Sequence, residues 1–124
     1  MMTTTSNPSG EWVCSFVQER IASQEGRGAP ARVQVGADEW GYTLSRATIK
    51  AGPAIVQLAN FGEDEHDLRL RRIGGTRTYR IGTVAPGRVG ELEARLLPGR
   101  FRLWCSLADH QARGMRATLL VKKA

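Results

Sequence analysis

The chain has 124 residues, with 18 basic against 12 acidic residues and a formal net charge of +6. This length gives one domain that can bury a hydrophobic core without disulfide support. The sequence holds no run of about 18 apolar residues that would cross a membrane, and no nucleic-acid recognition motif. The basic residues are scattered through alternating patterns, which is typical of solvated strand faces and also suits an acidic partner.

Residues 1–30 are predicted to be an N-terminal extension to the domain that follows. Residues 1–10 are rich in Thr and Ser and indicate a disordered tail, and 11–25 favour a short helix with Trp12 and Phe16 on its apolar side. The segment has no basic region followed by an apolar signal core. Either the protein is cytoplasmic, or the start seen in this chain has replaced or missed an export signal.

From Ala31 onward the sequence predicts an all-β domain, residues 31–124. Short apolar runs alternate with polar residues, and Gly- and Pro-containing turns separate them. No helical periodicity or internal repeat interrupts the pattern, so we expect a sandwich or barrel. The predicted strands are 32–37, 39–44, 47–50, 54–60, 66–72, 77–82, 88–95, 100–105 and 115–122.

The last two predicted strands are joined by a loop with the spacing Cys105-x4-His110-x4-Met115. The other histidine of the chain, His66, opens an earlier strand. A thiolate, two imidazoles and a thioether form a soft donor set that suits copper. Cys14 could in principle pair with Cys105, but a metal on Cys105 would leave Cys14 as a free thiol or a small buried residue.

Strand alternation bears on whether these residues point inward. Successive side chains of a strand face opposite sides, so the apolar set marks the core face. Each of the three strand-borne candidates carries the same parity as the apolar residues of its strand. Taken alone, each candidate could equally be an ordinary core or loop residue. The shared inward parity of all three favours one joint site. The three shared faces are Phe101, Leu103 and Cys105; Met115, Ala117, Leu119 and Val121; and His66, Leu68 and Leu70.

On these residues the sequence resembles the cupredoxins, the blue type 1 copper proteins that include plastocyanin, azurin and amicyanin. The resemblance covers roughly residues 33–122 and rests on AGPAIVQLANFGEDEHDL, PGRFRLWC and CSLADHQARGM. It implies a Greek-key β-sandwich of about eight strands holding one copper ion. By position, His66, Cys105 and His110 would be the equatorial ligands and Met115 the axial one.

The resemblance also implies residues that support the ligands. Asn60 ends the strand before the one that His66 opens, and Asp67 stands where many members of the family have Asn. The Asp67 carboxylate could accept a hydrogen bond from the hydroxyl or the backbone N–H of Ser106 and so hold the site rigid. Its negative charge would also stabilise Cu(II) over Cu(I).

The implied function is one-electron transfer between redox partners, not catalysis, because four ligands leave no open position for a substrate. The alternatives are a copper storage or delivery module, and a metal-free or zinc-loaded structural domain. The resemblance further implies work outside the cytoplasm, in the periplasm or at a membrane surface, and we expect a monomer. His110 would be the electron port, and an acidic partner would dock on the surrounding Leu107, Ala108, Arg113, Gly114 and Arg116.

Overall fold

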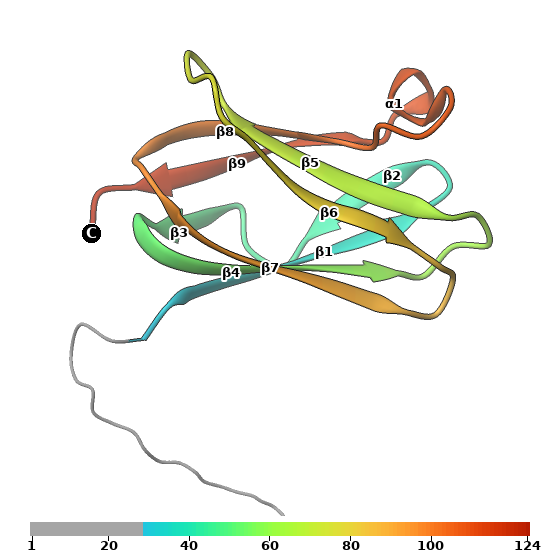
Figure 1. Cartoon of the computed structure of the whole chain (residues 1–124), viewed down its shortest axis with the longest axis horizontal. Coiled ribbons are helices and arrows are strands. Elements are labelled where there is room, and N and C mark those ends of the chain that lie inside the picture. Colours follow the sequence, from blue (N-terminus) through green and yellow to red (C-terminus); the bar gives the residue numbers. More distant parts are fainter. Residues whose placement is uncertain (1–28) are drawn as a thin grey trace, which may run out of the picture.

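A computed structural model describes residues 29–124, which form two β-sheets packed face to face (Figure 1). The elements of this part of the chain are nine strands and one short helix. Their bounds are β1 Ala31–Asp38, β2 Gly41–Leu44, β3 Thr48–Lys50, β4 Gly52–Asn60, β5 His66–Arg72, β6 Thr78–Val84, β7 Val89–Leu96, β8 Gly99–Trp104, α1 His110–Arg113 and β9 Arg116–Lys122.

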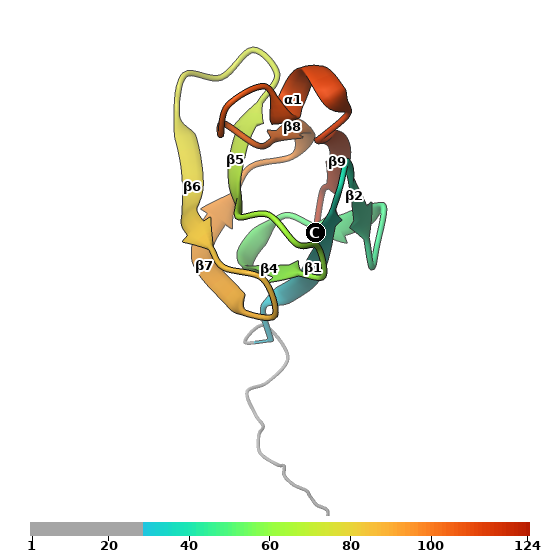
Figure 2. The same cartoon turned by 90° about the vertical axis from the view of Figure 1, so that its right-hand side faces the viewer.

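The two sheets differ in size and in the strands that they combine. One has the order β2-β1-β4-β7 and the other the order β3-β9-β8-β5-β6 (Figure 2). The pairs β1 with β4 and β3 with β9 are parallel, and the remaining pairs are antiparallel. Strands β5 and β8 are neighbours in the second sheet, so the beginning of β5 and the end of β8 lie side by side.

The core lies between the sheets and is built from the inward residues of the alternating pattern. Phe101 and Leu103 of β8, Leu68 and Leu70 of β5 and Val56 of β4 are each at most 1% exposed. Burial of each such side chain contributes about 1.5–3 kcal/mol of transfer free energy. The predicted parity of these strands is therefore correct, and the two inner faces fill the sandwich.

The all-β sandwich is confirmed, with nine strands where the family resemblance implied about eight. Most strand ends differ from the prediction by one or two residues. The predicted strand 39–44 starts at Gly41, because Glu39 and Trp40 form the turn between β1 and β2. The helix α1 was not predicted, since four residues are too few to show a helical period.

The tail predicted at 1–10, the helix predicted at 11–25 and Cys14 lie outside the described residues. Within residues 29–124, no helix is long and apolar enough to cross a membrane.

Candidate metal centre

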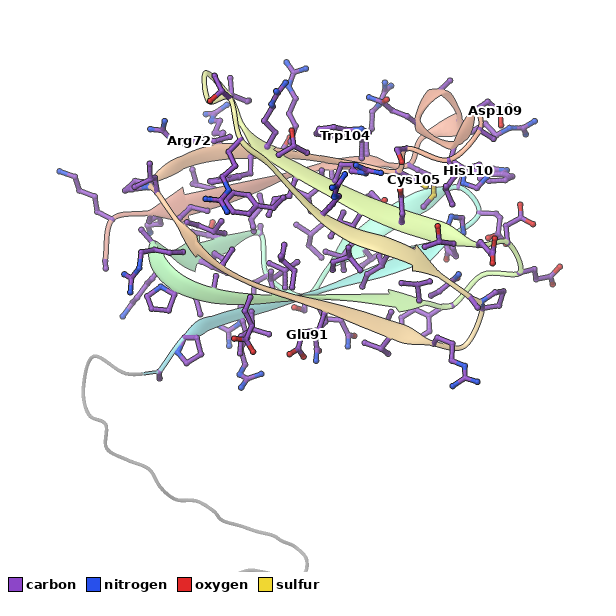
Figure 3. All side chains as sticks on the ribbon, viewed as in Figure 1. Arg72, Glu91, Trp104, Cys105, Asp109 and His110 are labelled. Atoms are coloured by element: carbon purple, nitrogen blue, oxygen red, sulfur yellow. The ribbon has the colours of Figure 1, made fainter. Side chains whose placement is uncertain are left out.

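The side chains of His66, Cys105 and His110 meet at one end of the sandwich. One ligand-type atom from each of them lies within 4.8 Å of those of the other two, and all three residues are buried. His66 opens β5, Cys105 follows β8, and His110 begins α1. Figure 3 shows Cys105 and His110 together near α1, at the end of the molecule where β8 runs out. Three of the four predicted ligands are thus brought into one cluster.

The loop from Cys105 to Met115 is closed by its own backbone. The N–H of Cys105 donates to the carbonyl of Met115 at 3.1 Å, and the N–H of Met115 donates to the carbonyl of His110 at 3.0 Å. Gly114 has φ +125°, and a Cβ there would lie 2.9 Å from the carbonyl oxygen of Trp40. Only glycine fits this position, so the tight loop carries Cys105 and His110 on a fixed backbone.

Met115 is fully buried, beside the loop's closing hydrogen bonds. Its parity agrees with the prediction, because Leu119 and Val121 of β9 are buried on the same side. Its role as the fourth ligand stays a prediction.

His66 is carried by a loop that Asn60 shapes. The Asn60 side chain is 1% exposed, and its Nδ2 donates to the carbonyls of Asp64 at 2.8 Å and Val84 at 2.9 Å. Its Oδ1 accepts from the N–H of Gly62 at 2.8 Å. Two of the three hydrogen bonds of this buried amide therefore fix the turn that precedes His66, and the third ties the amide to the end of β6.

Glu39 supplies the outer partner of His66. Its Oε2 lies 2.6 Å from Nε2 of His66, and its carboxylate also accepts from the N–H of Glu63 at 2.8 Å and of Asp64 at 3.3 Å. These contacts, led by the N–H of Glu63 and then by His66, hold the pKa of Glu39 below its ordinary value. An ionised carboxylate only accepts hydrogen bonds, so Nε2 of His66 carries the proton.

The other ring nitrogen of His66, Nδ1, is left without such a contact. It is buried and has no hydrogen-bond partner among residues 29–124. Buried polar atoms are nearly always satisfied, and an exception asks for an explanation. An unpartnered imidazole nitrogen beside Cys105 and His110 is available to bind a metal ion.

A second carboxylate, that of Asp67, ties β5 to the loop after β8. Its Oδ1 accepts from the backbone N–H of Ser106 at 2.7 Å, and its Oδ2 accepts from the Ser106 hydroxyl. Both contacts expected from the sequence are present. The hydroxyl of Tyr42 donates to the backbone carbonyl of Asp67. The chain on either side of the cluster is therefore pinned from β2, β5 and the 105–115 loop.

Cys105 is 1% exposed, and burial raises the pKa of its thiol. The backbone N–H groups of Asp67 and Leu107 act in the opposite direction, while the Asp67 carboxylate adds to the increase. Nδ1 of His110 lies 3.4 Å from the sulfur. A metal ion must therefore displace a proton from Cys105 to bind the thiolate.

Trp40 covers the cluster. Its ring centroid is 4.6 Å from that of His110 and 6.2 Å from that of His66, and the guanidinium of Arg113 lies 5.0 Å from it. His110 is consequently only 7% exposed. Arg113 also donates to Asp109 at 2.7 Å, which pairs its charge.

The residues predicted for docking surround this end of the molecule. Ala108, Arg113 and Arg116 are exposed, and Leu107 and Gly114 are partly exposed. Their role in binding a partner stays a prediction.

Glu39 and Trp40 are the residues of the site that the sequence prediction missed. Both were assigned to the strand 39–44, which left only residue 38 between two antiparallel strands. A hairpin needs at least about two residues in its turn. That short gap indicates that residues 39 and 40 belong to a turn. It does not indicate that this turn contacts the loops that carry His66 and His110.

Comparisons of the whole fold with solved structures give clear matches, whereas no protein-family model matches the sequence and a search of curated proteins finds no significant match. Reduced auracyanin from Roseiflexus castenholzii matches with a TM-score of 0.62 at 16% identity, covering 76% of this chain and 98% of that one. Auracyanin A of Chloroflexus aurantiacus, described as a "blue" copper protein, matches with a TM-score of 0.61 at 12% identity, covering 76% and 100%.

Two further matches lie at a lower score. Amicyanin from Paracoccus versutus has a TM-score of 0.53 at 21% identity, with 77% of this chain and 87% of that chain covered. A multicopper oxidase has a TM-score of 0.52 at 15% identity, with 76% and 45% covered. Auracyanin and amicyanin are both cupredoxins. This chain has the cupredoxin fold.

Proposed function

We propose that this protein is a mononuclear blue-copper protein that carries single electrons between redox partners. In this proposal His66, Cys105 and His110 are the strong ligands and Met115 is the weak axial ligand. The observation that carries the proposal is the buried, unpartnered Nδ1 of His66, which faces a thiol and a second imidazole. Two imidazoles, a thiolate and a thioether are the donor set of blue-copper electron-transfer sites.

The chemistry of the donors argues against the other uses of such a cluster. Bound copper would supply a Cu(II)/Cu(I) couple, which the sulfur and nitrogen donors support in both states. The chain has only two histidines, and both belong to this cluster, so no second copper centre can be built from imidazoles. A four-ligand site has no open position for a substrate, which favours a carrier over an oxidase.

The residues around the cluster are suited to holding it still. Glu39 fixes the tautomer and the ring orientation of His66, and Asp67 fixes the backbone beside Cys105. Trp40 keeps water from the His110 ring. A site that is formed in advance changes little between two oxidation states, and this lowers the cost of electron exchange. The match to auracyanin A, described as a "blue" copper protein, supports the same function.

The proposal extends to the organisation of the chain. Residues 31–124 would be one copper-binding domain and 1–30 an extension to it. An extracytoplasmic location is what the resemblance to the cupredoxins implies, and we propose it for this chain.

The test is voltammetry of the copper-loaded protein, with the copper content measured before and after cycling. A carrier gives a reversible one-electron wave and retains its copper against a Cu(I) chelator. Rapid loss of Cu(I) to the chelator would instead support storage or delivery. Protein that is purified from native cells with zinc, or without metal, and that gives no wave when copper is added would contradict the proposal.

A further inference from the structure

The outward side of the five-stranded sheet carries arginines in register across four strands. We call Arg69, Arg71, Arg80, Arg102 and Arg116 the arginine face. Residues paired across neighbouring strands project from the same side of a sheet. Pairing of β6, β5, β8 and β9 therefore aligns these side chains in two adjacent rows. One row is Arg80, Arg69, Trp104 and Arg116, and the other is Thr78, Arg71, Arg102 and Thr118.

Most of the charges of this face have no acidic partner within residues 29–124. In the strand register Arg69 lies directly opposite Arg80, and Arg71 lies directly opposite Arg102. Like charges in such positions destabilise a sheet. Strands β6, β8 and β9 hold no Asp or Glu.

The acidic residue of β5, Asp67, is buried and already accepts from Ser106. It lies 3.5 Å from Nε of Arg69, close enough for attraction but outside hydrogen-bond geometry. Within residues 29–124, the other four arginines of the face lie beyond salt-bridge distance of any carboxylate. These four guanidinium groups are therefore available to an anionic group from outside residues 29–124.

The two outward sides of the sandwich also differ in charge. The outward side of the other sheet instead carries both signs of charge, with Glu91, Glu93 and Arg95 on β7 and Arg32 and Asp38 on β1, and Nε2 of Gln57 donates to Glu91 at 3.0 Å. Figure 3 shows Glu91 on the side of the molecule opposite Arg72 and Trp104. Positive charge that is unmixed with negative charge on one side of a molecule orients an approaching anionic partner.

The arginine face also has a shape that can receive side chains. Arg71, Arg102 and Trp104 line a hollow whose other walls are the β5–β6 turn and Gln111. Guanidinium groups bind carboxylates through two parallel hydrogen bonds, and Arg and Trp are enriched at the energetic centres of protein interfaces. The remaining members of the rows are threonines, which offer a lipid layer much less aliphatic surface than leucines or phenylalanines would.

We propose that the arginine face is the docking surface for an acidic protein partner, whose Asp or Glu side chains enter the hollow beside Trp104. The row that contains Trp104 lies at the metal end of the sheet, because Trp104 precedes Cys105 and Arg116 follows Met115. A partner on this row lies beside the ligand cluster. That docking serves electron transfer rests on the proposed function. The binding itself does not require a metal.

Binding of poly-L-glutamate to the full chain tests the proposal, followed by amide NMR shifts and by affinity at several salt concentrations. The variant R71Q/R80Q/R102Q removes three exposed charges from the face. R32Q/R88Q/R95Q removes three exposed charges elsewhere and is the matched control. We expect the shifts to fall on β5, β6, β8 and β9. The face variant should bind about tenfold more weakly, and the control should bind nearly as the wild type does.

Equal loss in both variants would show that only net charge matters and would overturn the proposal. Tighter binding to phosphatidylglycerol vesicles or duplex DNA than to poly-L-glutamate, at the same ionic strength, would overturn it in favour of those partners. The titration is done on metal-free protein and repeated after copper addition. A chain that fails to bind copper but binds poly-L-glutamate through the arginine face would contradict the proposed function alone.

Discussion

Glu39 and His66 are 27 residues apart in sequence, yet the carboxylate of one lies 2.6 Å from Nε2 of the other. The His66 side chain is fully buried, while that of Glu39 is 24% exposed. The carboxylate therefore connects the solvent side of the β1–β2 turn to the interior of the cluster. Outer hydrogen bonds of this kind fix which nitrogen of a histidine is free to bind a metal and raise its basicity.

Glu39→Ala should weaken metal binding by about 10–100-fold, the usual cost of losing such a partner. The reason is that the His66 ring loses its fixed tautomer and orientation. Competition with a chelator of known affinity measures the loss, and nitrogen NMR of the metal-free protein reports the His66 tautomer directly. An unchanged affinity together with an unchanged tautomer would rule out this role for Glu39.

Gly62→Ala tests the same contact from the other side. A Cβ on residue 62 would overlap Oε2 of Glu39, so the carboxylate would have to move. We expect Gly62→Ala to weaken metal binding in the wild-type background and to have little further effect in the Glu39→Ala background. The two substitutions would then be strongly non-additive. Full additivity in this double-mutant cycle would show that Gly62 acts by another route.

Asp67→Asn should raise the reduction potential of the copper-loaded protein. An asparagine can keep the hydrogen bond to the N–H of Ser106 and turn its amide toward the hydroxyl, so the backbone stays in place. The negative charge near the thiolate, which favours Cu(II), is removed. Voltammetry measures the shift, and Ser106→Ala is the control that loses a hydrogen bond but keeps the charge. A lower potential in Asp67→Asn would contradict this role for the charge.

Metal affinity should rise with pH. Burial raises the pKa of the Cys105 thiol above its ordinary value, so the metal-free thiol is protonated near neutral pH. Each metal ion bound as a thiolate complex must then release that proton, and affinity should increase about tenfold per pH unit below this pKa. Proton release in weakly buffered solution and chelator competition at several pH values check this. Binding near pH 7 without release of a proton would mean that Cys105 is not a thiolate ligand.

The residues of the His66, Cys105 and His110 cluster could be predicted from sequence because two kinds of local information converge on them. The spacing from Cys105 to His110 to Met115 sits in one short loop, and strand parity points Cys105 inward without any knowledge of the fold. His66 could be predicted from the same parity, together with the fact that it is the one histidine of the chain besides His110. The structure adds that the donor atoms of His66, Cys105 and His110 lie within 4.8 Å of one another.

Glu39 and Trp40 could not be predicted in the same way. Their contacts with His66 and His110 arise from the packing of the β1–β2 turn against two other loops, and no spacing along the chain encodes such a meeting. The arginine rows are intermediate. Alternation places each arginine on an outward face, but the register that aligns Arg69 with Arg80 requires the sheet order.

The central claim is that the cluster binds copper through the Cys105 thiolate, and titration of the metal-free protein with Cu(II) tests it most directly. An intense visible thiolate-to-copper band should grow to saturation at one copper per chain and disappear on reduction. Cys105→Ser should abolish the band while leaving the strand content unchanged. No band in the wild-type protein, or a band of equal intensity in Cys105→Ser, would contradict the claim.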